Sequence, residues 1–128
     1  MGDVNEVTRE IVDAAYSVHT RLGPGLFESV YEAVLGQELE RRGFTVRRQM
    51  AVPLEVDGLH FEEAFRVDLL VDQRVVVELK SIEQLAPVHT KQVLTYLRLM
   101  KLPLGLLINF GGATLKEGLR RVVNAYAP

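Results

Sequence analysis

An apolar run that ends in alternating charges, at positions 75–80, places the strongest limit on how this chain can fold. Three consecutive valines are typical of a buried β-strand, because β-branched side chains pack well on a sheet. Side chains of a strand alternate between its two faces, so Glu78 and Lys80 project from the same face about 7 Å apart. Charged groups are rarely buried alone, so the pair predicts a nearby partner or ligand.

A second short strand, residues 65–71, carries Asp68 and is joined to the first by the polar residues 72–74. If all three linking residues form the loop of a hairpin, Asp68 faces Glu78, with Cβ atoms about 5 Å apart. A two-residue loop instead turns Asp68 to the opposite face and removes the site.

Two facing carboxylates repel, which raises the pKa of one of them unless a cation lies between them. Their oxygen atoms suit Mg²⁺ or Mn²⁺, and the chain has no Cys to supply thiolates for zinc. We infer a metal-dependent site that cleaves phosphodiester bonds, with Asp68 and Glu78 as metal ligands. The alternative is an ion pair of Lys80 with either carboxylate at a solvated sheet edge.

The remaining sequence predicts an α/β (α+β) protein with a mixed sheet flanked by helices. Apolar residues at helical spacing predict helices over residues 4–22, 27–42 and 87–101. Alternation and β-forming residues predict further strands over residues 44–56, 59–64 and 104–109. The order strand, helix, strand around the third helix predicts a parallel neighbour, and residues 115–125 predict a closing strand or a short helix.

Three polar side chains interrupt the inward half of the predicted third helix. His89, Gln92 and Tyr96 fall within about 60° of one another, on the side that should face the sheet. Gln92 and Tyr96 are uncharged donors suited to holding a phosphate or a water molecule. The alternative is a buried Tyr hydroxyl satisfied by Gln, with His89 as a capping or core-edge residue.

The first two predicted helices carry two further candidates. Glu28 shares a stripe with Tyr31 and Leu35, which places its carboxylate on the inward margin of the second helix. It is either a third acidic ligand or a residue that only stabilises the helix start. His19 lies at the edge of an apolar stripe, where it orients Glu28, contacts substrate or packs structurally.

Composition limits the class of protein. With 128 residues, 48% of them hydrophobic, the chain predicts one domain over residues 1–128. The polar N-terminus and the lack of a long apolar run predict a soluble, cytoplasmic protein with no membrane contact. A net charge of -2 does not by itself indicate a nucleic-acid-binding protein. Basic residues do cluster locally, at Arg41-Arg42, Arg47-Arg48 and Arg120-Arg121, where they either bind a phosphate backbone or are simply solvated surface residues.

Several short motifs are distributed along nearly the whole chain. They are Gly25-Leu26-Phe27-Glu28-Ser29-Val30-Tyr31, Asp68, Glu78-Leu79-Lys80, Leu85-Ala86-Pro87-Val88-His89, Gln92-Val93-Leu94-Thr95-Tyr96 and Leu107-Ile108-Asn109-Phe110. Together they resemble the GxxExxY protein family, which is assigned to the PD-(D/E)XK nuclease superfamily. The resemblance implies a restriction-endonuclease-like mixed sheet between helices. Val67 stands where the superfamily motif has Pro.

The resemblance also implies roles for the matching residues. Asp68 and Glu78 are expected to bind Mg²⁺ or Mn²⁺, and the Leu79 carbonyl to add an oxygen ligand. Lys80 is expected to be the catalytic lysine, and Glu28 matches the acidic residue of the leading helix.

Gln92 and Tyr96 are similar to the Gln-x-x-x-Tyr motif of the branch that includes RecB-type exonuclease domains. We therefore expect a nuclease in which water attacks a phosphodiester in line with the departing oxygen. We expect DNA to be favoured over RNA as substrate, and a homodimer to strengthen substrate binding. A catalytically silent module that binds nucleic acid or a protein is the alternative. A third hypothesis, a structural dimerisation unit, predicts an exposed apolar patch at Leu102-Pro103-Leu104 and the C-terminal segment.

Overall fold

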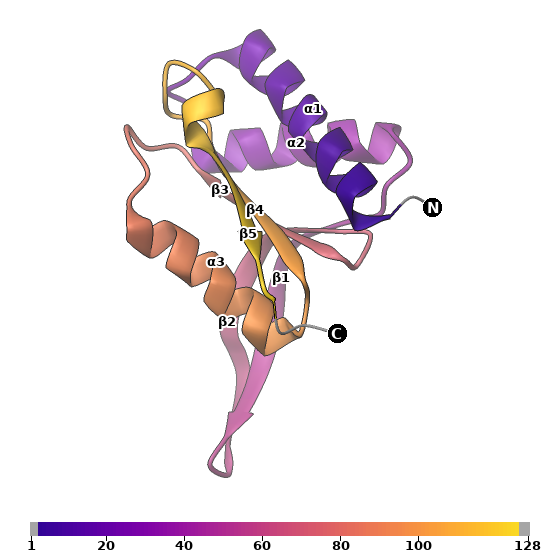
Figure 1. The fold of residues 1–128 in the computed structure, drawn as a ribbon, viewed down its shortest axis with the longest axis vertical. Coiled ribbons are helices and arrows are strands. Elements are labelled where there is room, and N and C mark those ends of the chain that lie inside the picture. The colour runs from indigo at the N-terminus through magenta and orange to yellow at the C-terminus, as the bar shows by residue number, and fades with distance from the viewer. Residues whose placement is uncertain (1–2, 126–128) are drawn as a thin grey trace.

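The computed structural model describes residues 3–125 and contains a mixed five-stranded sheet with helices on both faces (Figure 1). The helices are α1 (Val4–Leu22), α2 (Glu28–Arg41), α3 (Pro87–Met100) and a short 3-10 helix, η1 (Lys116–Gly118). The strands are β1 (Val46–Val56), β2 (Leu59–Val71), β3 (Val75–Lys80), β4 (Leu104–Asn109) and β5 (Leu119–Val123). The predicted α/β (α+β) class is confirmed.

The strands lie in chain order across the sheet. β1, β2 and β3 form an antiparallel meander, β4 runs parallel to β3, and β5 is antiparallel to β4. Two predictions differ from the structure in detail. Residues 59–71 form a single strand, since no Gly or Pro interrupts them, and residues 116–123 form both a 3-10 turn and a closing strand.

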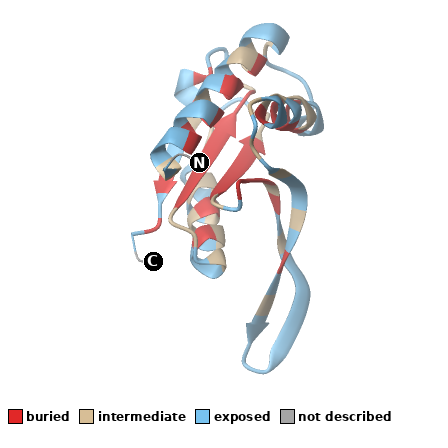
Figure 2. Cartoon of the chain, turned by 90° about the vertical axis from the view of Figure 1, so that its right-hand side faces the viewer, coloured by how far each residue is buried: buried red, intermediate tan, exposed pale blue. Residues whose placement is uncertain are grey.

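A separate hydrophobic cluster lies on each face of the sheet, so the central strands are buried on both sides (Figure 2). α1 and α2 cover the face that carries Val75 and Val77, whereas α3 covers the face that carries Val76. Full burial of each such side chain contributes about 1.5–3 kcal/mol. Because side chains alternate along β3, Glu78 and Lys80 face the α3 side at the end of this buried strand.

The outer half of the β1–β2 hairpin extends beyond both clusters as an exposed arm (Figures 1 and 2). Leu59 and Phe61 on this arm are 59% and 46% exposed. The register of the hairpin shifts between Val52 and Leu54, where Pro53 has no N–H to donate to the ladder. Only the inner half of the hairpin, which includes Asp68, therefore packs against the core.

The apolar patch expected at residues 102–104 does not form. Leu104 is buried and Leu102 packs partly against the cluster under α3, because the segment leads directly into β4. The last part of the C-terminal segment, residues 126–128, lies outside the described residues. No helix within residues 3–125 has the length and apolar character needed to cross a membrane.

Candidate active site

The loop between β2 and β3 has three residues, which sets the register that the site requires. Residues 72 and 73 have left-handed φ values of 51° and 57°, and the antiparallel ladder begins at the pair Val71 and Val75. Counting back from that pair brings Asp68 level with Glu78. The three-residue loop predicted from the sequence is therefore confirmed, and the two-residue alternative is excluded.

At the position of Asp68, side-chain carboxyl groups replace the main-chain ladder. The recorded pairing of β2 with β3 ends at Leu69 and Val77. Beyond it, the N–H of Asp68 donates to Glu78 Oε1 at 3.0 Å, and the N–H of Leu79 donates to Asp68 Oδ2 at 2.8 Å. Both carboxyl groups are thus held between the two strands rather than projecting freely into solvent.

Burial and like charge make full ionisation of this pair unfavourable. Glu78 is 5% exposed, and burial, followed by the charge of Asp68, raises the pKa of Glu78 to about 8. Burial is also the largest cause that raises the pKa of Asp68, with the charge of Glu32 adding to it and the N–H of Leu79 opposing it. The two carboxyl groups contact each other directly, so the pair holds a proton to a higher pH than an isolated carboxyl group does, unless a cation replaces that proton.

Gln49 and Glu32, which the sequence did not single out, complete this side of the site. Gln49 Nε2 donates to Glu32 Oε1 at 2.6 Å and to Asp68 Oδ1 at 3.1 Å. Arg48 Nη2 forms an ion pair with Glu32 Oε2 at 3.2 Å. Gln49 has a left-handed φ of 49°, which interrupts the β1–β2 pairing opposite Asp68. Its side-chain amide therefore connects Asp68 to α2.

Glu28, the acidic residue selected from α2, is exposed and lines a small pocket of about 110 Å³ together with Glu32, Gln49 and Asp68. Its role as a third ligand stays a prediction. The buried carboxylate is that of Glu32, one turn later and 5% exposed. A signal for it exists in the sequence, because Glu32 falls among the buried positions of α2 that include Leu35.

Lys80 lies on the α3 side of the sheet and is half-buried. Its charge lowers the pKa of Glu78, but by less than burial raises it. Within residues 3–125 Lys80 forms no ion pair at 4.0 Å or less. The alternative of an ion pair at a solvated edge does not describe this site, because Glu78 is buried.

Tyr96 reaches the same carboxyl pair from α3. Its ring stacks on Phe65, with centroids 4.1 Å apart and planes inclined by 8°. Burial, and then the negative charges of Glu78 and Asp68, raise the pKa of Tyr96, while a hydrogen bond with Gln92 lowers it. The phenol is therefore protonated at neutral pH and can donate. The predicted inward stripe places Tyr96 where the charges of both carboxylates act on it, with Gln92 as its hydrogen-bond partner.

The two candidate histidines have structural contacts elsewhere. His89 Nδ1 accepts a hydrogen bond from the Ala86 N–H at 2.9 Å, so the capping role predicted for it is confirmed. His19 Nε2 lies 3.1 Å from the Gly112 carbonyl oxygen, and its ring is tilted against Phe110. These contacts of His19 involve neither Glu28 nor the carboxyl pair, and contact with substrate stays a prediction.

The segment from Gly25 to Tyr31 joins the helices to the end of β3. The Tyr31 hydroxyl donates to the Gly23 carbonyl at 2.5 Å and accepts from the Leu26 N–H at 3.2 Å. Ser81 Oγ donates to the Leu26 carbonyl at 2.5 Å. Gly25 has a φ of 101°, a conformation that favours glycine. The signature residues Gly25 and Tyr31 therefore shape the loop beside the site.

One arginine in each of two arginine pairs forms internal ion pairs. Arg42 contacts three carboxylates, those of Glu10, Asp13 and Glu38, at 2.8–3.1 Å. Arg48 is paired with Glu32 beside the site. These two side chains are therefore committed to the fold, so local positive charge for a phosphate chain has to come from other basic residues, such as Lys80.

The donor set fits a small divalent cation. Mg²⁺ usually binds through one or two carboxylates and completes its shell with water and phosphate oxygens. Asp68 and Glu78 supply two oxygen-bearing groups in contact, with raised pKa values that a cation would lower. Within residues 3–125 no group of three or more His, Cys, Asp or Glu side chains is placed to hold a metal ion. The two carboxylates are thus the protein ligands to test first.

A family model described as the PD-(D/E)XK nuclease superfamily matches residues 5–122. The chain belongs to this superfamily. Membership of the PD-(D/E)XK nucleases confirms the resemblance at superfamily level and makes the chain a nuclease-type protein, whereas the GxxExxY and Gln-x-x-x-Tyr assignments stay predictions. No curated protein and no solved structure matched the chain.

Proposed function

We propose that the chain is a nuclease that hydrolyses nucleic-acid phosphodiester bonds with Mg²⁺ or Mn²⁺ as cofactor, and that DNA is favoured over RNA. The observation that carries the proposal is the direct contact between the carboxyl groups of Asp68 and Glu78, with Tyr96 beside them. Two carboxylates in contact, one buried and one half-buried, repel each other unless a cation lies between them, and PD-(D/E)XK nucleases generally use divalent metals.

Each residue near the pair has a role in this proposal. Asp68 and Glu78 would hold the cation, with the Leu79 carbonyl as a further oxygen ligand and Glu28 as a third acid. The bound cation would neutralise the phosphate and promote ionisation of a water molecule. Gln49 holds Asp68 Oδ1 in place from the opposite side of that carboxylate.

The residues on the α3 side act on the substrate. Lys80 orients the attacking water and stabilises negative charge on the phosphoryl oxygens, since an ammonium that is half-buried is less screened than one in bulk water. Tyr96 donates a hydrogen bond to a phosphoryl oxygen, and Gln92 supports the Tyr96 hydroxyl. His19 would contact the nucleic acid at the rim of the site.

The motifs support a finer assignment. The loop built by Gly25 and Tyr31 supports placing the chain in the GxxExxY family. The hydrogen bond of Gln92 with Tyr96, on which the charges of the carboxyl pair act, supports placing it in the Gln-x-x-x-Tyr branch.

A cleavage assay tests the function. Purified wild type and Lys80→Ala are incubated with end-labelled single- and double-stranded DNA and RNA, with Mn²⁺, with Mg²⁺ or with chelator. The expected result is cation-dependent cleavage by wild type, fastest on DNA, that falls by about 100-fold or more in Lys80→Ala. Lys91→Ala is the matched control, because Lys91 lies on the exposed face of α3 and should leave cleavage unchanged.

Two outcomes would contradict the proposal. Full activity in Lys80→Ala would remove the lysine from the mechanism. Saturable Mn²⁺ binding in a calorimetric titration without cleavage of any substrate would instead favour the catalytically silent module.

A further inference from the structure

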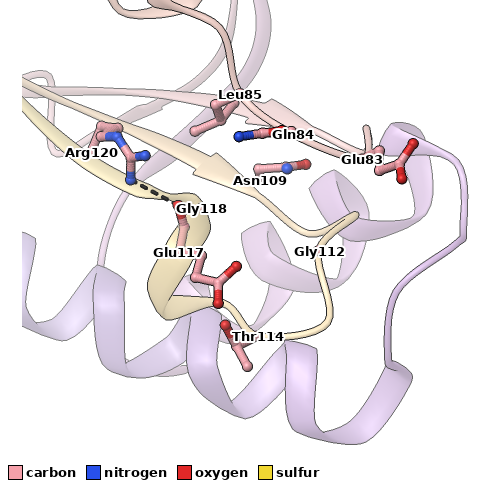
Figure 3. Close-up of a pocket in the computed structure, with 9 residues that line it drawn as sticks. All are labelled: Glu83, Gln84, Leu85, Asn109, Gly112, Thr114, Glu117, Gly118 and Arg120. Carbon is pink, nitrogen blue, oxygen red and sulfur yellow. Dashed lines mark hydrogen bonds between the residues drawn. The ribbon is translucent and has the colours of Figure 1, made fainter.

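A second cavity lies one strand away from the carboxyl pair. It measures about 540 Å³, within the range of pockets that hold small molecules, and lies among the loops after β3 and β4 and the helix η1 (Figure 3). Asn109 at the end of β4 pairs with Lys80 at the end of β3, and neighbouring strands are about 4.8 Å apart. Leu107 packs under α3, so Asn109, two residues on, faces the same side as Lys80.

The wall of this cavity is closely packed around Asn109. Asn109 is 2% exposed, and its Oδ1 accepts from the N–H groups of Ile82 and Gly111 at 3.0 Å. Its Nδ2 donates to the Ile82 carbonyl at 2.9 Å. Gly111 approaches the Ile82 backbone and Gly118 approaches Asn109 so closely that neither position has room for a Cβ. The cavity is therefore part of the folded framework.

The polar groups that line the cavity differ between its two ends. Figure 3 shows Arg120 at one end and Glu83 at the other, with Gln84 between them and Glu117 and Thr114 on the η1 side. Arg120 Nη1 donates to the Glu117 and Leu119 carbonyls at 2.8 Å, which leaves Nε and Nη2 without a recorded partner in residues 3–125. In the same part of the chain no hydrogen bond is recorded for the side chains of Glu83, Gln84, Thr114 and Glu117.

We infer that this cavity binds a nucleotide unit of the substrate next to the scissile bond, with its base toward Glu83 and Glu117 and its phosphate toward Arg120. The inference rests on the proposed function. A carboxylate repels phosphate and accepts hydrogen bonds. Adenine, cytosine and guanine offer it an exocyclic amino group with two N–H donors, whereas uracil and thymine offer a single N3–H between two carbonyl oxygens that a carboxylate repels, so the cavity favours adenine, cytosine or guanine over uracil and thymine. A base in this cavity is unpaired, so the substrate is a single strand, an end or a locally opened duplex.

Binding of mononucleotides tests the cavity without any need for cleavage. Cytidine and uridine monophosphate are titrated into the ¹⁵N-labelled protein, and the amide signals of Gly112 and Gly118 are followed. Saturable shifts are expected with cytidine monophosphate, and affinity at least about tenfold weaker with uridine monophosphate, which lacks the amino group. Equal binding of the two, or no shift at either glycine, would overturn the inference.

Two variants separate the cavity from the catalytic centre. Arg120→Ala should weaken binding of cytidine monophosphate about tenfold, whereas Arg121→Ala removes the same charge from the next residue, which does not line the cavity, and should not. Thr114→Trp should fill the cavity, raise KM for a single-stranded oligonucleotide and leave hydrolysis of a small chromogenic phosphodiester unchanged. Loss of the small-diester activity as well would show that the variant damages the catalytic centre and would count against a separate subsite.

The two proposals fail in different ways. Nucleotide binding in a protein that cleaves nothing would contradict the nuclease function and leave the cavity assignment standing. Cleavage that is insensitive to Thr114→Trp and Arg120→Ala would overturn the cavity assignment alone.

Discussion

The backbone N–H of Asp68 donates a 3.0 Å hydrogen bond to the carboxylate of Glu78. This bond takes the place of a rung of the ladder between β2 and β3, whose recorded pairs end one residue earlier. The Leu79 N–H makes the corresponding bond to Asp68, so each carboxylate satisfies a backbone donor of the opposite strand. The site is therefore formed by the sheet itself, at the point where two of its strands separate.

Replacing Glu78 by Gln should abolish cation binding and preserve the fold. The amide is close in size to the acid and carries no charge, so it removes the repulsion with Asp68. We expect Mn²⁺ to raise the Tm of the wild type and to leave that of Glu78→Gln unchanged. Thermal unfolding with and without Mn²⁺ measures this, and an equal Mn²⁺-dependent rise in both proteins would exclude Glu78 as a ligand.

The stability of the cation-free protein should fall as pH rises toward 8. The pKa of Glu78 is about 8 in the folded protein and near 4.5 when unfolded, so the folded state binds more protons between these values. Stability that Glu78 contributes below pH 4.5 is therefore lost as pH rises through about 8, by a few kcal/mol at most. Urea unfolding with chelator at several pH values should show this fall in the wild type and a smaller one in Glu78→Gln.

Gln49→Asn should lower cleavage more than stability. Asn tolerates the left-handed backbone at this position, but its shorter side chain cannot bridge Glu32 and Asp68. Loss of orientation at Asp68 is expected to reduce kcat by about tenfold or more. The control is Gln37→Asn on the exposed face of α2, and equal activity of both variants with wild type would refute a positioning role.

Tyr31→Phe should destabilise the protein by about 1–2 kcal/mol, because two hydrogen bonds to the loop before α2 are lost while stacking on Phe110 remains. Tyr16→Phe is the control, since Tyr16 is 40% exposed. Urea midpoints measure the difference, and identical midpoints for the two variants would show that the hydroxyl of Tyr31 does not hold the loop.

Tyr96→Phe should retain the stacking on Phe65 and lose the only donor that the ring offers to a phosphoryl oxygen. Cleavage is expected to fall by about 10-fold to 100-fold, with little change in Tm. Steady-state kinetics on a labelled oligonucleotide measure the effect. Unchanged kcat and KM would confine Tyr96 to a packing role.

Local sequence patterns were sufficient to predict the main elements. The apolar periodicity of residues 4–22 and the valine run before Glu78 are confirmed as α1 and β3. The three polar residues between β2 and β3 allowed a three-residue or a two-residue loop, and the structure has the three-residue loop that places Asp68 beside Glu78. The helix and the strand depend on neighbours in the chain, and so they can be read from it.

The contacts of Gln49 could not be predicted from local sequence patterns. Its left-handed backbone lies inside a strand without Gly or Asn, and its two carboxylate partners come from α2 and β2. Glu32 was missed for a related reason, because the stripe on α2 shows which residues face inward but not which basic or amide group meets them. Contacts between distant segments depend on how the elements pack.

The amino-acid sequence by itself determined the helices, most of the strands and the membership of a nuclease superfamily, since these depend on local spacing and short motifs. It left two loop lengths open between β2 and β3, and the structure decided for the one that places Asp68 level with Glu78. Only the tertiary structure decided that Glu32 rather than Glu28 is the buried acid, that Gln49 joins it to Asp68, and that a cavity of about 540 Å³ lies at Asn109, the strand partner of Lys80. Burial and long-range hydrogen bonds arise when the layers pack together, and no single segment of the chain contains them.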